Sequence, residues 1–223
     1  MNRIQLPIFQ LDDIQVSYGK NNVLKIGNFK FHRGTIYGIV GTVGSGKTTL
    51  LNLLRGEINP NEGSVLYEDN PFERSFFGKV KPIPEIIFFG DYPSNSKLSV
   101  KDKISSVLPE RSVQIRKKYY SSSQYSASWD TPINKQSPGQ VKRMEMIIGA
   151  ESDPKILMID NYGNYFDSQM KREMNQKFKQ NAKKRGTTII LTTTDIERVR
   201  HVSSVLIFLD NGHISKIRSL AKQ

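Results

Sequence analysis

The sequence contains no cysteine, only three histidines and no long apolar run. Without cysteine the chain forms neither disulfides nor thiolate metal sites, and His32, His201 and His213 are too scattered to suggest a metal site. No stretch of about 18 apolar residues, the length that suggests a transmembrane helix, is present. Residues 1–7 lack the apolar segment of a secretory signal. Together these absences favour a protein that works in the cytosol.

The charge is strongly positive. The 223 residues carry a net charge of +12, and their hydrophobic content of 37% suffices for the core of one domain spanning residues 1–223. Seven cations lie within residues 171–185, against one acid, Glu173. The simplest interpretation is a solvated helix face, with contact to an anionic membrane surface as the alternative. Aromatic residues do not interleave with these cations as they do in proteins that stack single-stranded bases, so nucleic acid is not the expected partner.

Apolar runs bounded by glycine and polar turns predict alternating strands and helices. The predicted strands are 8–18, 29–32, 35–40, 63–68, 84–89, 156–159, 187–192, 205–209 and 213–217. The predicted helices are 47–54, 100–108, one beginning at Ser137, 168–184 and a short one before residue 205. This order predicts an α/β fold with a mainly parallel sheet covered on both faces, closed by a hairpin turn at Asn211-Gly212. Residues 119–129 carry no pattern that assigns them.

A glycine-rich loop, Gly41–Thr49, lies between a predicted apolar strand and a predicted helix. Gly41, Gly46, Lys47 and Thr48 match the spacing G-x-x-x-x-G-K-[ST]. Glycines let backbone N–H groups turn toward phosphate oxygens, and the start of the helix adds its positive end. In such loops the lysine reaches the β- and γ-phosphates, and the threonine hydroxyl binds Mg²⁺. The loop therefore predicts a nucleoside triphosphate site, which also includes Gly44, Ser45 and Thr49.

An acidic residue follows the buried strand predicted at 156–159. This residue is Asp160, and Asn161 comes directly after it. A carboxylate at the end of such a strand is where the magnesium-organising aspartate lies in phosphate-loop folds. Thr48 and Asp160 are therefore the predicted metal ligands, Asp160 through water.

A third motif, Gln136-Ser137-Pro138-Gly139-Gln140, opens a predicted helix. Ser137 is a favourable N-cap, Gln140 stands at capping-box spacing from it, and proline suits the first helical position. With its motifs in this order, the chain resembles the nucleotide-binding subunits of ABC transporters over nearly its whole length. The signature of that family is Leu-Ser-Gly-Gly-Gln, which completes the ATP site of the opposing subunit. Ser137, Gly139 and Gln140 match it, whereas Gln136 and Pro138 depart from it.

The resemblance implies an ABC-type ATPase of the P-loop NTPase fold. Besides the parallel core sheet, it implies an N-terminal antiparallel β subdomain and a short helical lobe, with the signature, inserted at about residues 91–150. It also implies ATP and Mg²⁺ as cofactors, with Tyr18 stacked on adenine. The residues implied to bind nucleotide or metal are Tyr18, Gly41, Gly44, Ser45, Gly46, Lys47, Thr48, Thr49 and Asp160, and for the partner's site Ser137, Gly139 and Gln140.

Several positions of the hydrolytic machinery depart from the family. Asn161 replaces its catalytic glutamate, Thr194 its switch histidine and Gly90 a glutamine, whereas Asp167 matches the aspartate that ends the loop after the second motif. An amide has no proton affinity with which to activate water, and loss of a general base costs about 10²–10⁴ in rate. The sequence therefore predicts ATP binding with weak or absent hydrolysis, Asn161 and Thr194 being inactive catalytic positions.

The family works as head-to-tail dimers on an integral membrane permease, which implies a cytoplasmic protein at the inner face of the cell membrane. Two copies of this chain would lack the catalytic glutamate and histidine at both sites. A heterodimer with a competent ATPase subunit is therefore expected over a homodimer. Two alternatives stay open: a nucleotide-gated regulatory or nucleic-acid-associated module without transport, and an active homodimer in which Asp195 or Asp167 is the base.

Overall fold

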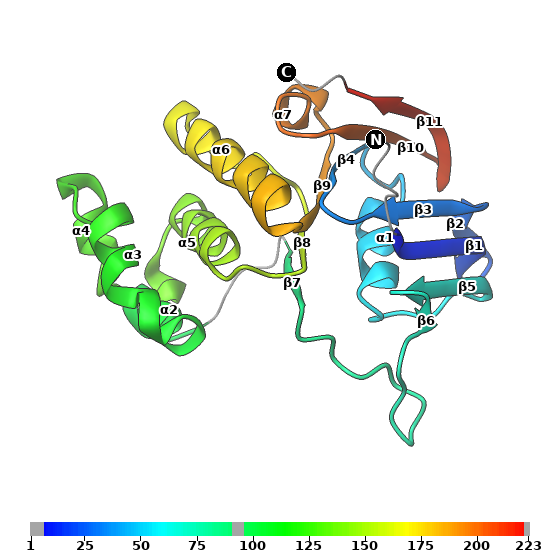
Figure 1. The fold of residues 1–223 in the computed structure, drawn as a ribbon, viewed down its shortest axis with the longest axis horizontal. Helices are drawn as coiled ribbons and strands as arrows, with labels where there is room; N and C mark the ends of the chain where they lie inside the picture. Colours follow the sequence, from blue (N-terminus) through cyan, green and yellow to red (C-terminus); the bar gives the residue numbers. More distant parts are fainter. Residues whose placement is uncertain (1–6, 91–95, 221–223) are drawn as a thin grey trace.

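A six-stranded sheet forms the centre of the computed structural model, which describes residues 7–90 and 96–220. Its order is β11-β10-β4-β9-β8-β7. The strands are β4 (Ile36–Val40), β7 (Ile86–Phe89), β8 (Ile156–Ile159), β9 (Thr188–Thr193), β10 (Val205–Asp210) and β11 (His213–Ser219). Neighbouring strands are parallel except β10 and β11, which the Asn211-Gly212 turn joins as a hairpin. The predicted mainly parallel α/β sheet is confirmed (Figure 1).

Two apolar layers cover this sheet, because successive side chains of a strand point to opposite faces. The covering helices are α1 (Lys47–Leu54), α5 (Pro138–Glu151), α6 (Ser168–Arg185) and α7 (Ile196–Val199). Leu157 and Ile159 of β8 share a cluster with α5 and α6. Ile156 and Met158 share the other with α1 and a second sheet. All four side chains are buried, as expected for a strand that is a continuous apolar run.

The second sheet is the N-terminal antiparallel one that the resemblance implied. Its order is β2-β1-β5-β6, with β3 also paired to β1. The strands are β1 (Pro7–Tyr18), β2 (Asn21–Ile26), β3 (Phe29–His32), β5 (Glu62–Tyr67) and β6 (Asn70–Pro71). Strands β2 and β6 were not predicted. The signal for β2 is the alternation of Leu24 and Ile26, both buried, with polar neighbours.

Helices occupy the region between β7 and β8, where a lobe at about 91–150 was predicted; residues 91–95 lie outside the described residues. They are α2 (Val100–Val107), η1 (Pro109–Arg111), α3 (Ser112–Tyr119), α4 (Ser123–Trp129), η2 (Ile133–Lys135) and α5. The unassigned segment 119–129 contains the end of α3 and all of α4. Its order comes from burial, because the rings of Tyr120 and Trp129 pack 5.1 Å apart inside the lobe.

Glu151, the last residue of α5, links this lobe to α6. Its carboxylate accepts a hydrogen bond from the Tyr119 hydroxyl at 2.6 Å and pairs with Lys118 and Lys177, each at 3.2 Å. Burial alone would raise the pKa of Glu151, but these partners outweigh it and hold the pKa below its ordinary value. The carboxylate is therefore ionised at neutral pH and joins three elements. Among the described residues, no helix is long and apolar enough to cross a bilayer.

Candidate functional site

The glycine-rich loop connects the end of β4 to the start of α1. A side chain at Gly41 would place its Cβ 2.3 Å from the Leu209 carbonyl oxygen. Gly46 has φ +98°, and a Cβ there would lie 2.7 Å from Leu24 Cδ2. Both positions therefore require glycine. The turn that results aims the first N–H groups of α1, which have no partner within the helix, toward the loop.

Lys47 is buried and folds back into this loop. Its Nζ donates to the carbonyl oxygens of Gly41 at 2.9 Å and Thr42 at 2.6 Å, and lies 3.3 Å from Ser45 Oγ. Burial lowers the pKa of Lys47, and the carboxylate of Asp160 opposes that shift. A cation is thus held at the positive end of a helix. This combination favours an anionic ligand.

Asp160 meets Thr48 across 112 residues of sequence. Its Oδ2 accepts a hydrogen bond from Thr48 Oγ1 at 2.6 Å, and its Oδ1 accepts from Thr192 Oγ1 and from the Asn161 N–H. The two predicted metal ligands therefore lie side by side, and both are the hard oxygen donors that Mg²⁺ prefers. Over the ranges that the structure describes, no three His, Cys, Asp or Glu residues form a metal cluster. A single carboxylate suits Mg²⁺, which is held largely by phosphates and water in nucleotide sites.

Two residues that support this site were not predicted. Thr192 is fully buried, and its hydroxyl bonds Asp160 as well as accepting from the Asn161 N–H at 3.1 Å. The Gly212 N–H donates a hydrogen bond to the Ser45 carbonyl at 3.1 Å, so the β10–β11 hairpin contacts the glycine-rich loop. The signal for Thr192 is a hydroxyl at the polar end of an apolar strand. The contact of Gly212 depends on tertiary packing, which the local sequence does not encode.

The positions predicted to be inactive catalytic residues lie just after the ends of two strands, β8 and β9. Asn161 comes after Asp160 and has φ +53°, a left-handed conformation that asparagine adopts more readily than glutamate. Thr194 follows β9 and is exposed. Gly90 follows β7, and its carbonyl accepts from the buried Lys142 of α5 at 2.9 Å. A glycine has no side chain with which to reach a metal or a water molecule.

The two carboxylates considered as alternative bases are engaged elsewhere. Asp195 caps α7 by accepting from the Glu197 N–H at 2.9 Å, and it pairs with Arg198 at 3.5 Å. Asp167 caps α6 by accepting from the Met170 N–H at 2.7 Å. Both carboxylates are therefore held in local structural bonds.

The third motif forms the expected capped helix start. Gln140 N–H donates to Ser137 Oγ at 3.3 Å, and Ser137 N–H donates to Gln140 Oε1 at 2.8 Å. This confirms the predicted capping box, with Pro138 in the first turn. Gly139 lies beside Tyr165, whose carbonyl oxygen would be 3.5 Å from a Cβ at this glycine.

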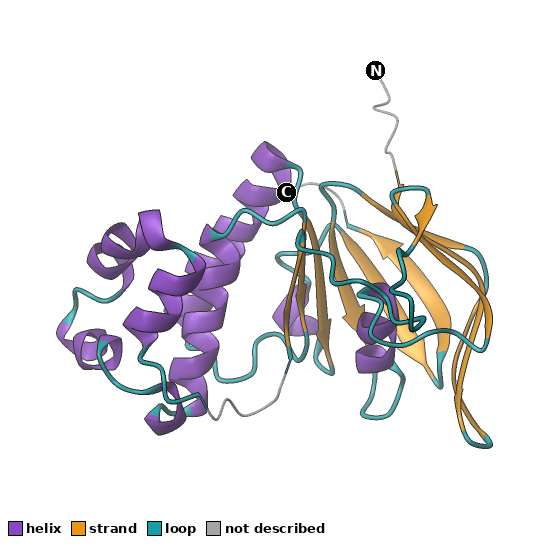
Figure 2. Ribbon diagram, turned by 90° about the horizontal axis from the view of Figure 1, so that it is seen from below, coloured by secondary structure: helices purple, strands orange, loops and turns teal. Residues whose placement is uncertain are grey.

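The structure does not bring this motif together with the glycine-rich loop. Helix α5 belongs to one apolar layer and α1 to the other, with the parallel sheet between them (Figures 1 and 2). Tyr18, the predicted adenine contact, stands at the end of β1 with 54% of its surface exposed. The site residues therefore form two separate groups, one around Lys47 and Asp160 and one around Ser137.

Gln136 has a structural role at its position. Its Oε1 accepts from Ser128 Oγ at 2.6 Å, and its Nε2 donates to the carbonyl oxygens of Ser128 at 2.7 Å and Thr131 at 3.1 Å. These bonds fix the end of α4 against the segment that leads into α5. Gln136, which stands where the family signature has leucine, therefore has polar partners in the lobe that leucine could not bond.

Replacing Gln136 with leucine should destabilise the protein, although leucine is the family's residue. The change leaves three polar groups of Ser128 and Thr131 without this partner, at a cost of about 1–3 kcal/mol. Each kcal/mol lowers Tm by roughly 2–4 °C in a chain of this size. Thermal unfolding followed by circular dichroism measures the shift. Gln114→Leu, the same change at an exposed position of α3, is the control; an equal Tm for the two variants would contradict this role.

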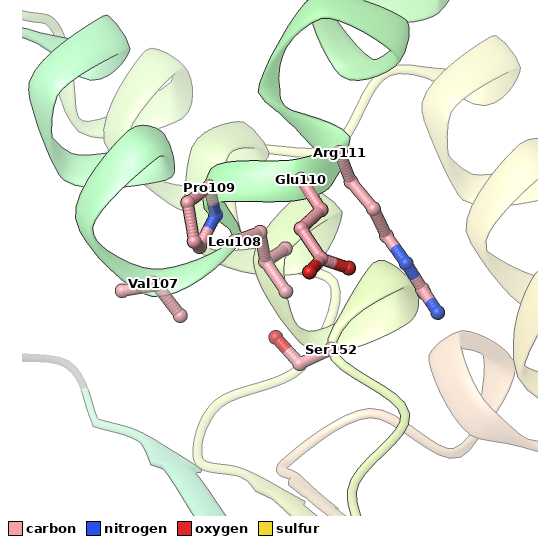
Figure 3. Close-up of a pocket in the computed structure, with 6 residues that line it drawn as sticks. All are labelled: Val107, Leu108, Pro109, Glu110, Arg111 and Ser152. Atoms are coloured by element: carbon pink, nitrogen blue, oxygen red, sulfur yellow. The ribbon is translucent and has the colours of Figure 1, made fainter.

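A shallow pocket lies elsewhere in the lobe. It is lined by Val107, Leu108, Pro109, Glu110, Arg111 and Ser152, from the end of α2, from η1 and from the residue after α5 (Figure 3). No predicted nucleotide or metal ligand lines this pocket. The candidate site is therefore defined by the glycine-rich loop and its partners.

Comparison with known proteins points to one family. The family described as ABC transporter matches residues 24–164, which include the glycine-rich loop, the third motif and Asp160. The spermidine/putrescine import ATP-binding protein PotA of Clostridium acetobutylicum is 27% identical over an alignment of 218 residues, which covers 94% of this chain. The chain spans 60% of the length of that relative.

Solved structures share the fold over nearly the whole chain. The structure of cbiO1 from Clostridium perfringens, part of the ABC transporter complex cbiONQ, has a TM-score of 0.76 at 23% identity and covers 96% of this chain and 88% of its own. A bacterial ABC transporter cassette solved as a dimer has a TM-score of 0.76 at 21% identity, covering 96% of this chain and 100% of its own. These similarities confirm the predicted ABC-type ATPase fold.

Proposed function

This chain belongs to the ABC transporter family, and from that premise we propose that it is the ATP-binding subunit of a heteromeric transporter with weak or absent hydrolysis at its own site. One contrast carries the proposal. Lys47, Thr48 and Asp160 are present and assembled, whereas Asn161 and Thr194 offer no base and no imidazole. The residues that grip nucleotide are retained, and those that act on water are replaced.

The retained residues account for binding. Lys47 contributes a desolvated positive charge, and the first turn of α1 contributes N–H donors for phosphate oxygens. Thr48 and Asp160 would hold Mg²⁺, which neutralises phosphate charge when bound. Thr192 orients the Asp160 carboxylate through its hydroxyl. Tyr18 is free on one face to stack on adenine, since more than half of its surface is exposed.

The replaced residues account for slow turnover. Asn161 can hold a water molecule but cannot take its proton, and the Thr194 hydroxyl is shorter than an imidazole. The capping bonds of Asp195 and Asp167 weigh against the alternative of an active homodimer that uses one of them as base.

The separation of the two residue groups supports a site shared between subunits. Within one chain the sheet separates α1 from α5, so the signature at Ser137–Gln140 can contact nucleotide only on a second subunit. A competent ATPase partner would receive this signature, and a permease would dock at the helical lobe. A cassette with this fold has been solved as a dimer.

Affinity purification from native membranes tests the proposal. The tagged chain, extracted in mild detergent with ATP and Mg²⁺, is expected to retain a second ABC ATPase and a multi-span membrane protein. Mass spectrometry identifies both, and the Lys47→Ala variant, which should bind nucleotide poorly, is expected to lose the second ATPase. Recovery of this chain alone as a dimer with steady ATP turnover contradicts the heteromeric, hydrolysis-deficient assignment. Recovery of ribosomes or DNA contradicts transport.

A further inference from the structure

A hairpin projects from the body of the protein between β6 and β7 (Figure 1). We call residues 73–81 the aromatic hairpin. Its strands are bonded to each other, because the Ser75 N–H donates to the Lys79 carbonyl at 2.7 Å and the Lys81 N–H donates to the Glu73 carbonyl at 2.8 Å. This part of the chain is therefore an ordered turn with a defined tip.

The base of the aromatic hairpin is fixed to the body. Val80 packs so closely on Gly56 that a Cβ there would lie 2.6 Å from Val80 Cγ1. Arg74 Nη2 donates to Asn59 Oδ1 at 2.9 Å, and its Nη1 donates to the Gly78 carbonyl at 3.0 Å within the hairpin. One end is thus anchored to the turn after α1, while the other extends into solvent.

Two phenylalanines form the tip. Phe76 is 98% exposed and Phe77 is 87% exposed, and their rings meet edge to face at 5.6 Å. Adjacent aromatic side chains are the largest apolar surface that a short turn can present to a partner. Isolated exposed apolar residues are ordinary, but two at the end of an anchored projection are positioned to enter an apolar phase.

The charge around the tip indicates the chemical nature of the partner that the two phenylalanines enter. Arg74, Lys79 and Lys81 flank the phenylalanines, and Glu73, the one acid of the hairpin, pairs with Lys81 at 3.1 Å, so the hairpin keeps an excess of positive charge. The occupant must therefore be apolar at depth and anionic at its surface. Two phenylalanines bury about 300–500 Å², less than the roughly 800 Å² that each partner buries in a standard protein interface. A bilayer needs no complementary pocket, and aromatic residues beside cations are typical of segments that enter its interfacial region.

We propose that the aromatic hairpin inserts Phe76 and Phe77 into the interfacial region of an anionic lipid bilayer. The cations at its flanks contact the lipid phosphates while the two rings enter the acyl boundary. Through this contact the ATP-binding subunit binds the membrane directly, without a permease and without nucleotide.

Flotation with lipid vesicles tests the insertion on the purified full-length chain, without a permease. Binding is expected to vesicles of phosphatidylcholine mixed with phosphatidylglycerol and to be weak on phosphatidylcholine alone. The affinity of the double variant Phe76→Ser/Phe77→Ser for the mixed vesicles should be lower by roughly tenfold or more. Val113→Ser, which removes a 79% exposed apolar residue from α3, should bind like the unchanged protein.

A tryptophan at the tip reports depth directly. Phe77→Trp should be quenched by brominated phosphatidylcholine in mixed vesicles, whereas the native Trp129 is buried and should not respond. Unquenched Phe77→Trp, or equal vesicle binding by the double serine variant and Val113→Ser, overturns the proposal. If the serine variant keeps full vesicle binding but loses the membrane protein recovered by affinity purification, the occupant is a protein and the lipid proposal is equally overturned.

Discussion

Replacing Lys47 with alanine should lower the affinity for ATP–Mg²⁺ by about 30-fold to 3,000-fold. The ammonium group is buried inside the loop, where it already bonds two backbone carbonyls and lies 3.3 Å from Ser45 Oγ. Removing one partner of a buried charge pair costs about 2–5 kcal/mol, and each 1.4 kcal/mol is about tenfold in affinity. Isothermal titration calorimetry with ATP in the presence of Mg²⁺ measures the change.

The matched control for Lys47→Ala is Lys216→Ala on the exposed strand β11. It removes the same charge from the protein, so any general electrostatic attraction for ATP falls equally in both variants. Circular dichroism should show both variants folded, because alanine at position 47 leaves room for water at the loop carbonyls. Equal affinities for the two variants would show that nucleotide does not bind at Gly41–Thr49.

Asn161→Glu combined with Thr194→His should raise ATP hydrolysis about 10²-fold or more in a dimer that can close. The glutamate supplies the general base, an effect of about 10²–10⁴, and the histidine supplies an imidazole beside it. Thr194→His alone should change little, because no group would then take the proton. Phosphate release under steady-state conditions, with the dimer verified by light scattering, measures the rate.

The backbone at Asn161 sets the control for this experiment. Its φ of +53° is less favourable for glutamate than for asparagine, so the substitution should lower stability by about 1–3 kcal/mol. Asn161→Gln with Thr194→His has the same chain length and strain but no carboxylate. A rise with glutamate that glutamine does not reproduce isolates the base. No rise in a dimer shown to close would mean that Gly90 or the altered signature limits hydrolysis instead.

Local chemistry explains what the sequence predicts well. The loop Gly41–Thr49, the capped start of α5 and the buried strand that precedes Asp160 each follow from neighbouring residues, and the family match covers all three. The hydrogen bond between Thr48 and Asp160 was implied only through a shared metal. The two side chains can bond directly because strands β4 and β8, which precede them, lie on either side of β9 in one sheet.

Tertiary contacts account for what the sequence did not predict. Helix α4 has a polar, low-complexity sequence, and its order derives from burial of Trp129 and from the bonds of Gln136. Gly212 was predicted as a turn residue, and its bond to Ser45 arises because the hairpin folds onto the loop. The aromatic hairpin carries no periodic signal, since Phe76 and Phe77 face water and Val80 alone packs on the body.

The position of β4 also has a consequence for synthesis of the protein. This strand carries the nucleotide loop and is made early, yet its neighbours in the sheet, β9 and β10, begin at Thr188 and Val205. Gly212, whose N–H bonds the Ser45 carbonyl of the loop, is synthesised later still. On the ribosome the loop therefore lacks these neighbours until the chain has been translated beyond Gly212. A ligand stabilises only the state that binds it, so nascent chains that end before these neighbours gain little stability from ATP.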